Sequence, residues 1–546
     1  MNALASIPNL VSWVIFLPAL GALVVMVLRS DAAIRWVTLA VTTLTFLLSL
    51  GLWAGFDPAV STADGPQLAE HARWFPGVDI SYYVGIDGIN LLLVLLTTLL
   101  GPILVLSSWT YIHEHLRGYH ALMLVLQTGV LGVFCSFDLF LFYVFFELTL
   151  IPMYFVIGIW GGEERVYAAI KFVLYTLGGS LLMLVGVIWL GFAAGDAVNG
   201  GTFTTDYFKL VSYGVPLSAQ LWLFALFALA FAIKVPLFPF HTWLPDAHVQ
   251  APTGGSVVLA GVLLKMGTYG LLRFCLPFFP NAAQQYAPII AVLAVIGIIY
   301  GALVAFAQPD AKKLIAYSSV SHLGFVVLGL FAFTTEAAQG ALLQMINHGI
   351  STGALFLLIG MLYERRHTRL MADFGGIAKT VPVLSFFMLF TVFASAGLPG
   401  LNGFVGEFMI LLGSFRSAVP GYQVLTILAT TGVILAAVYL LWMVYRTFFG
   451  EVTHEENRTI RDLNGREVGL LVPLVVFMIW IGMQAAPFLA PSEAAIRGLL
   501  MTTEAKAAAI EAAGPDAVVT VPMQWPSNVA LTPTPAPPAP APAAGH

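Results

Sequence analysis

The chain has 546 residues, of which 59% are hydrophobic and only 9% are charged, and its formal net charge is −5. A soluble globular chain has about 25% charged residues, so this composition excludes a soluble protein and indicates an integral membrane protein. The small net charge gives no information about partners.

Apolar segments long enough to cross a bilayer, roughly 20 residues each, occur about fourteen times along the chain. The sequence therefore predicts an all-α integral membrane protein. No basic residue precedes the first segment, so we do not expect a cleaved signal peptide. The predicted spans are 10–28, 34–55, 86–109, 119–136, 138–160, 170–194, 219–240, 253–275, 287–307, 313–333, 339–362, 382–412, 423–448 and 469–489.

Lysine and arginine favour the cytoplasmic side of a membrane. If the N-terminus lies outside and the spans alternate, most of the 23 Lys and Arg residues fall in inside loops. This distribution predicts that both termini lie on the outer side. The segment from about 505 onward is Ala-rich and ends in "TPTPAPPAPAPAAGH", a composition that predicts an extended, mobile appendage.

Four charges fall inside predicted spans rather than at their ends: Glu147, Lys234, Lys265 and Glu407. A central charge costs roughly 2.5–3.5 kcal/mol on insertion scales, so such residues are usually functional. Glu147 and Lys234 are the obvious ion pair, and opening or closing that pair would move a proton. Lys265 has no carboxylate near it in sequence, and a desolvated lysine can accept and release a proton. The alternative is that these charges are static pairs that hold helices together.

Two predicted spans are interrupted next to a buried charge. Pro236 and Pro239 follow Lys234, and the stretch "GLPGLNG" precedes Glu407. Proline removes an amide donor, and freed backbone groups at membrane depth must contact protein or water. Each break is in the fourth member of a five-span set, spans four to eight and spans nine to thirteen. Five is odd, so the second set is inverted relative to the first, as in transporters with inverted repeats.

This reasoning divides the chain into five parts. They are spans one to three with an outside loop (1–118), the first inverted repeat (119–276), the second inverted repeat (287–450), a loop with the last span (451–490), and an Ala/Pro-rich tail (491–546).

Histidines supply possible links between these charges. His322 and His348 lie well inside spans ten and eleven, and histidine can pass protons near neutral pH; a lone buried histidine is more often a satisfied core residue. His241 and His248 flank "TWLPDA" at the inner end of span seven. Their spacing with Asp246 is a weak metal signal, and we favour polar contacts that line an inner entrance.

The two cysteines, Cys135 and Cys275, lie in separate apolar segments without metal spacing, so we interpret both as core thiols. No phosphate loop, haem motif or dinucleotide fingerprint is present. We therefore expect no redox centre, cofactor or metal in this chain.

Several motifs resemble the antiporter-like membrane subunits of respiratory complex I. They are "FAIKVPLFPFHTWLPDAHVQAPTGGSVVLAGVLLKMGTYGLLR" (231–273), "DAKKLIAYSSVSHLG", "NHG" and "GLPGLNGFVGEF". The resemblance extends across most of the predicted spans. Sister subunits usually carry lysine where this chain has Glu407, and the long C-terminal transverse helix of the largest sister is absent.

The resemblance implies a role for each buried polar residue. Glu147 and Lys234 match the family's ion pair, Lys265 its central lysine, His322 and His348 its polar positions, and Glu407 its terminal charged residue. Protons would enter from the inside, pass through these residues and leave to the outer side, driven by quinone reduction in other subunits.

The resemblance also implies the setting of the chain. NADH, FMN, iron–sulfur clusters and quinone would bind to partner subunits. The partners would be other complex I membrane subunits, including two sister antiporter-like subunits, and lipids, with no nucleic acid. The location would be the bacterial inner (plasma) membrane.

Two alternatives remain open from the sequence. One is a subunit of a multisubunit cation/proton antiporter or a membrane-bound hydrogenase on the same fold. The other is a passive structural subunit that anchors its neighbours.

Overall fold

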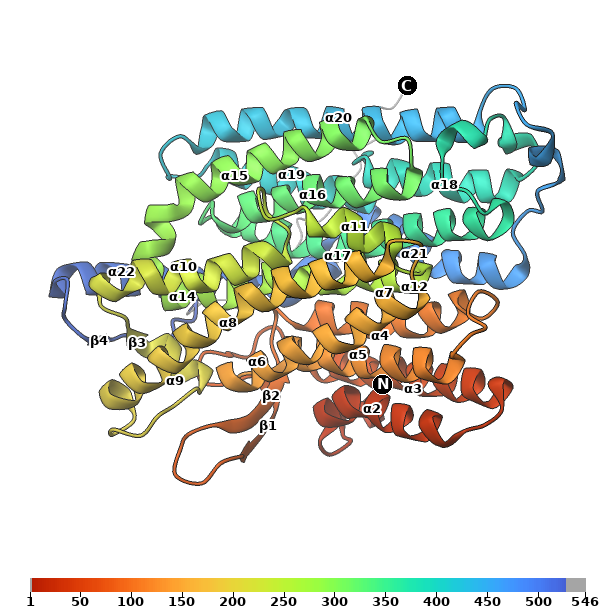
Figure 1. The fold of residues 1–546 in the computed structure, drawn as a ribbon. Helices are drawn as coiled ribbons and strands as arrows, with labels where there is room; N and C mark the ends of the chain where they lie inside the picture. The colour runs from red at the N-terminus through yellow and green to blue at the C-terminus, as the bar shows by residue number, and fades with distance from the viewer. Residues whose placement is uncertain (1, 527–546) are drawn as a thin grey trace, which may run out of the picture.

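Long, roughly parallel helices build most of the protein, which we describe from a computed structural model over residues 2–526 (Figure 1). Within these residues, twelve helices are long and apolar enough to cross a membrane, and three shorter apolar helices accompany them.

The N-terminal part contains four helices and one β-hairpin. Ser30 caps the third helix, because its hydroxyl accepts a hydrogen bond from the amide of Ala33. The two strands pair antiparallel, a small feature that the all-α prediction did not include. The elements are α1 (Asn2–Ala5), α2 (Leu10–Val27), α3 (Asp31–Gly55), β1 (Gln67–Arg73), β2 (Ser81–Ile86) and α4 (Leu91–Ser107).

The middle part contains the first predicted helix break. The helix that ends at Lys234 does not continue through Pro236 and Pro239, and the chain becomes helical again at Trp243, as two prolines require. The helix that carries Lys265 includes two π-helical turns, η1 and η2. The elements are α5 (Leu116–Cys135), α6 (Leu139–Leu148), α7 (Leu150–Trp160), α8 (Arg165–Val198), α9 (Tyr207–Ser212), β3 (Tyr213–Gly214), α10 (Leu217–Lys234), α11 (Trp243–Gln250), α12 (Thr253–Val258), η1 (Leu259–Leu263), α13 (Leu264–Gly270), η2 (Leu271–Cys275) and α14 (Leu276–Phe278).

The C-terminal part contains the second predicted break. Gly397 and Gly400, between α18 and α19, have φ values of +77° and +92°, which glycine adopts without strain. The elements are α15 (Pro280–Phe306), α16 (Ala311–Leu330), α17 (Thr335–Arg366), η3 (Met371–Asp373), η4 (Ile377–Lys379), α18 (Pro382–Ser395), α19 (Asn402–Phe415), α20 (Tyr422–Phe448), η5 (Glu455–Thr459), α21 (Gly465–Met483), α22 (Ala486–Ala513) and β4 (Val519–Thr520).

Each of the fourteen predicted spans falls on helix in the structure. Several of them are short or divided: α4 has 17 residues, the fifth span is divided between α6 and α7, and the twelfth is divided between α18 and α19. The fold class and both helix breaks are confirmed, whereas the number of membrane crossings and the inverted repeats stay predictions.

The predicted tail begins too early. The sequence analysis assigns residues 491–513 to the tail, and those from about 505 onward to an extended appendage, but they belong to α22, which is followed by β4 paired with β3. The Ala-rich sequence is a good helix former, and buried residues such as Ile496, Leu499 and Ile510 attach α22 to the bundle. The Pro/Ala repeat at 527–546 lies outside the described residues.

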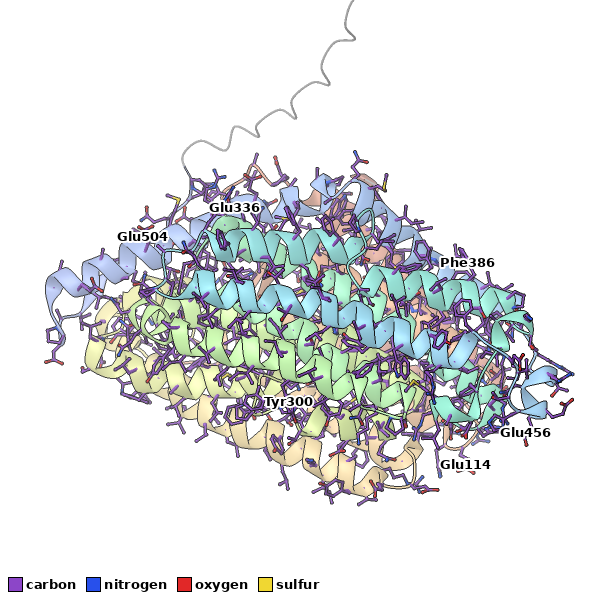
Figure 2. The ribbon with its side chains drawn as sticks, turned by 90° about the horizontal axis from the view of Figure 1, so that it is seen from above. Glu114, Tyr300, Glu336, Phe386, Glu456 and Glu504 are labelled. Atoms are coloured by element: carbon purple, nitrogen blue, oxygen red, sulfur yellow. The ribbon has the colours of Figure 1, made fainter. Side chains whose placement is uncertain are left out.

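The two ends of the bundle carry different loops. Figure 2 shows Glu114 and Glu456 at one end and Glu336 and Glu504 at the other. We call the first the basic end, because Arg365, Arg366 and Arg369 all follow or end α17 there, and Arg366 forms an ion pair of 2.5 Å with Glu456.

Two central helices are enclosed by protein along almost their whole length. Side chains 254–278, from α12 to α14, are buried, and α17 is buried from Ala337 to Leu362. These helices carry Lys265 and His348. Their polar residues therefore face other helices instead of lipid, which is where ionisable groups at membrane depth are tolerated.

Candidate proton-relay site

Lys265 is fully buried and its ammonium group has two partners. The π-helical turn η1 precedes it, so the amide of Leu264 bonds to the carbonyl of Leu259, five residues back. In an α-helix that amide would bond to Ala260. The carbonyl of Ala260 instead accepts a hydrogen bond from Nζ of Lys265, which also lies 2.7 Å from Nδ1 of His348.

A line of polar side chains continues from His348 to Glu407. The rings of His348 and His322 have centroids 6.1 Å apart, and Nδ1 of His322 lies 2.9 Å from Oε1 of Glu407. Lys265, His348, His322 and Glu407 are at most 3% exposed. Residues from four different segments, α13, α17, α16 and α19, are thus brought together, with His348 beside Lys265 and His322 beside Glu407.

Two further side chains, Tyr439 and Gln344, fix this line, and the sequence analysis missed both. The hydroxyl of Tyr439 lies 3.2 Å from Nε2 of His322, and Nε2 of Gln344 donates to Oε1 of Glu407 at 3.1 Å. A neutral His322 with its proton on Nδ1 fits both contacts, because it donates to Glu407 and accepts from Tyr439. Isolated Tyr and Gln residues in apolar spans give no signal that distinguishes them from core residues.

The second helix break places Glu407. Asn347 of α17 donates to the carbonyl of Asn402, the first residue of α19, at 2.7 Å. A Cβ atom at Gly397 would lie 3.2 Å from Oε2 of Glu407. The carboxylate therefore reaches back to the irregular segment between α18 and α19, where backbone groups are not engaged in a helix.

Lys234 and Glu147 lie in the same region but are not in direct contact. Nζ of Lys234 and Oε1 of Glu147 are buried without hydrogen-bond partners, and no N–O contact within 4.0 Å joins the two side chains in residues 2–526. Nζ of Lys234 instead lies 5.0 Å from the ring centroid of Phe146 and 5.5 Å from that of Phe172. The structure therefore holds the Glu147–Lys234 pair open, and its closed state stays a prediction.

His241 and His248 have different surroundings. The ring of His241 packs against Phe238 and Tyr300, and the ring of His248 stacks on Phe356 at 4.6 Å. Both ring nitrogens of each residue are buried without partners. No group of three or more His, Cys, Asp or Glu side chains that could hold a metal ion occurs in the described part of the chain.

Three more buried charges, beyond the four that the sequence placed inside spans, are Arg273, Lys312 and Lys506. Arg273 forms a fully buried ion pair with Asp87, with contacts of 2.6 and 2.7 Å, and also donates to Tyr269. Lys312 and Lys506 are 7% and 0% exposed. Hydropathy does not show which distant segments contact these residues, so their burial could not be predicted from the sequence.

Buried, directly adjacent groups that can each gain or lose a proton are suited to proton transfer. Lysine, histidine and carboxylate can all act as both donor and acceptor in one of their protonation states. The histidine–histidine step is the longest in the line. A water molecule that bridges two polar groups is nearly as favourable as a direct hydrogen bond, and Nε2 of His348 has no protein partner in the described chain.

Known proteins share both the sequence and the fold. Residues 136–438 match the family described as "NADH:quinone oxidoreductase/Mrp antiporter, TM". The NADH-quinone oxidoreductase subunit M of Rhodobacter capsulatus is 45% identical over 493 residues, which cover 87% of this chain and 93% of the relative.

Two solved structures give the same result at the level of the fold. A chain of respiratory complex I from Thermus thermophilus with bound NADH superposes with a TM-score of 0.80 and 35% identity, covering 92% of this chain and 99% of that one. A chain of the Mrp complex from Dietzia sp. DQ12-45-1b superposes with a TM-score of 0.77 at 21% identity, covering 92% and 99%. The second likeness shows the fold alone.

Proposed function

Because this chain belongs to the NADH:quinone oxidoreductase/Mrp antiporter family and, within it, to the subunit M relatives, we propose that it is the proton-translocating membrane subunit M of an NADH:quinone oxidoreductase. It moves protons through Lys265, His348, His322 and Glu407. The observation that carries this proposal is the buried line of contacts from Lys265 to Glu407.

Lys265 receives a proton from the basic end and passes it to His348. The proton crosses to His322 through bridging water, reaches Glu407, and leaves toward the end that carries Glu336. The positive-inside rule supports this direction, since it assigns the basic end to the cytoplasmic side. Both termini then lie on the outer side of the bacterial inner membrane.

Glu147 and Lys234 control the affinity of this line for protons. An open pair leaves an uncompensated ammonium beside the relay, and a closed pair neutralises it. Moving one charge against about 100 mV requires roughly 2.3 kcal/mol, and removing one partner of a buried ion pair costs about 3–5 kcal/mol. The electrostatic free energy of a buried pair such as this one is therefore of the same order as the free energy needed to move one proton against the membrane potential.

The driving reaction takes place in partner subunits. NADH, FMN, iron–sulfur clusters and quinone bind there, and this chain holds no redox centre. Its neighbours are the other membrane subunits of the complex, including two sister antiporter-like subunits, and membrane lipids. A cation/proton antiporter subunit is the alternative, which the Mrp likeness supports at the level of the fold alone.

The test uses Glu407→Gln in the complete complex, in inverted membrane vesicles, with Glu336→Gln as the matched control on an exposed carboxylate. NADH-driven quinone reduction and proton uptake are recorded together, and assembly is checked on native gels. We expect Glu407→Gln to assemble but to lose both activities, and Glu336→Gln to keep them. Normal proton uptake in an assembled Glu407→Gln complex would show that Glu407 is structural. Sodium-driven proton movement without NADH would favour the antiporter.

A further inference from the structure

An apolar pocket of about 270 Å³ lies between α3, α4, α17, α21 and the start of α22. Within the described chain, only leucine, isoleucine, phenylalanine, proline and tryptophan side chains line it. A buried water molecule needs two to four polar partners, and the side chains of these walls offer only the indole N–H groups of Trp53 and Trp480. The pocket is therefore suited to an apolar ligand and not to water.

The mouth of this pocket lies at the end of the bundle opposite to the basic end. α21 begins at the basic end, where Glu467 forms an ion pair of 2.6 Å with Arg365. Trp480 is near the other end of α21, is 46% exposed, and lines the pocket together with partly buried Trp53. Tryptophan is enriched where a membrane protein crosses the boundary between hydrocarbon and water. The two rings thus mark the level of the lipid headgroups.

Both tryptophans have a free donor at this level. Within residues 2–526, neither indole nitrogen donates a hydrogen bond to another group of the chain. Tryptophan combines a large apolar ring with one N–H donor. The mouth can therefore bind a molecule that has ester or phosphate oxygens at one end and an apolar chain at the other.

The floor of the pocket lies against the helix that carries His348. Ile346 and Ile350 of α17 line it on the two sides of His348 in sequence, and Ile350 is near the middle of that helix. Leu96 of α4 also lines the pocket, and a Cβ atom at Gly349 would lie only 2.6 Å from Cδ2 of Leu96. The pocket thus extends from the headgroup level to the central part of α17.

We propose that this pocket binds one acyl chain of a membrane phospholipid. The ester and phosphate oxygens lie beside Trp53 and Trp480, and the end of the chain contacts Leu96 and Ile350. This inference goes beyond the proposed function and does not depend on proton translocation, because it requires only that the chain lies in a membrane.

The size of the pocket supports this occupant. An apolar cavity of about 150 Å³ holds a benzene molecule, so 270 Å³ holds a stretch of hydrocarbon chain. A helix of a neighbouring subunit, about 10–12 Å across, is too wide to enter it. An empty cavity destabilises a protein in proportion to its volume, and acyl chains are the medium that surrounds these helices in a bilayer.

The test uses a phosphatidylethanolamine that carries a photoreactive diazirine near the end of one acyl chain. The complete complex is reconstituted with this lipid and illuminated, and the labelled residues are identified by mass spectrometry. Leu99→Trp enlarges a partly buried side chain that lines the pocket. Leu428→Trp is the matched control, because Leu428 is 44% exposed on α20 and lies outside the pocket.

We expect wild type and Leu428→Trp to be labelled at Leu96 and Ile350, and Leu99→Trp to lose these adducts. Labelling of exposed Ile434 on α20 shows in every sample that the probe has reacted. Equal labelling of Leu96 and Ile350 in Leu99→Trp and wild type overturns the inference. Loss of the adducts when a quinone with a long isoprenoid tail is added would assign the pocket to that tail and also overturn it.

If Leu99→Trp does not assemble, the wild-type complex decides the question. Adducts at Leu96 or Ile350 support an acyl chain in the pocket, because both side chains are at most 3% exposed and lie at its floor. Adducts confined to exposed positions such as Ile434 overturn the proposal.

Discussion

Nζ of Lys265 lies 2.7 Å from Nδ1 of His348, although 83 residues separate the two in sequence. The contact joins α13 and α17, two segments that are enclosed by protein. It exists because the turn η1 precedes Lys265 and gives its ammonium a carbonyl acceptor beside the histidine ring. The nearest polar partners of this buried lysine are thus a carbonyl oxygen and an imidazole nitrogen instead of a carboxylate.

His348→Gln should stop proton transfer without unfolding the protein. Glutamine keeps a polar group beside Lys265 but cannot carry a proton between two ring nitrogens. We expect normal assembly and a loss of NADH-driven proton uptake of about tenfold or more, measured in inverted vesicles. His71→Gln, on an exposed histidine of β1, should have no effect. Full activity of an assembled His348→Gln complex contradicts the relay.

Lys234→Met should also assemble normally. The ammonium of Lys234 makes no hydrogen bond in the structure, so methionine removes a buried charge without leaving a partner unsatisfied. Quinone reduction and proton uptake should nevertheless both decrease, since the switch with Glu147 is lost. The ratio of activity to assembled complex on native gels measures this effect. Poor assembly with normal specific activity would indicate a structural role instead.

Substitutions at Arg273 and Asp87, unlike Lys234→Met, should lower the stability and assembly of the subunit. Each is completely buried, and removing one partner leaves an uncompensated charge, which costs about 3–5 kcal/mol. Arg273→Met and Asp87→Asn should therefore each lower the thermal midpoint and the amount of assembled subunit. The double variant should lose less than the sum of the two single variants. Additive losses would show that the pair does not act as a unit.

Lys506 should make stability depend on pH. This lysine of α22 donates to the carbonyls of Val211 and Pro277 at 2.8 and 2.9 Å, a number of bonds that a neutral amine can form. Burial lowers the pKa of Lys506 from 10.5 to about 7. Between these two values the unfolded chain binds a proton that the folded chain lacks, so stability rises with pH across this window and falls as pH decreases toward 7.

The measurement is the thermal midpoint of this subunit in the purified complex, at about pH 7 and about pH 9. Wild type should gain more stability at the higher pH than Lys506→Met, in which the titrating group is missing. Glu504→Gln, an exposed change on the same helix, should match wild type. An equal gain in wild type and Lys506→Met contradicts this prediction.

Hydropathy and local chemistry could predict the helices, both breaks and the central charges. Lys234, Lys265 and Glu407 are recognisable because each lies well inside an apolar segment, and prolines or glycines lie beside two of them. Lys312 and Arg273 could not be recognised in this way. Each lies near the end of a span, where sequence predicts solvent or lipid headgroups, and only tertiary packing shows that other segments cover it.

The Glu147–Lys234 pair shows another limit. Sequence identifies the two charges but not whether they are in contact, because that distance depends on how α6 and α10 pack. The early start assigned to the tail has a similar cause. An Ala-rich segment is equally compatible with a free helix and a docked one, and the docking of α22 depends on residues far away in sequence, such as Val211 and Pro277.

The two helix breaks also leave electric dipoles inside the membrane. α10 ends at Lys234, so the negative end of its dipole lies beside an ammonium, and α19 begins at Asn402, so its positive end faces the region to which the Glu407 carboxylate reaches back. Each dipole has the sign that favours the charged form of its neighbour. Part of the field that acts on these residues therefore belongs to the backbone, and it persists when the side chains are replaced.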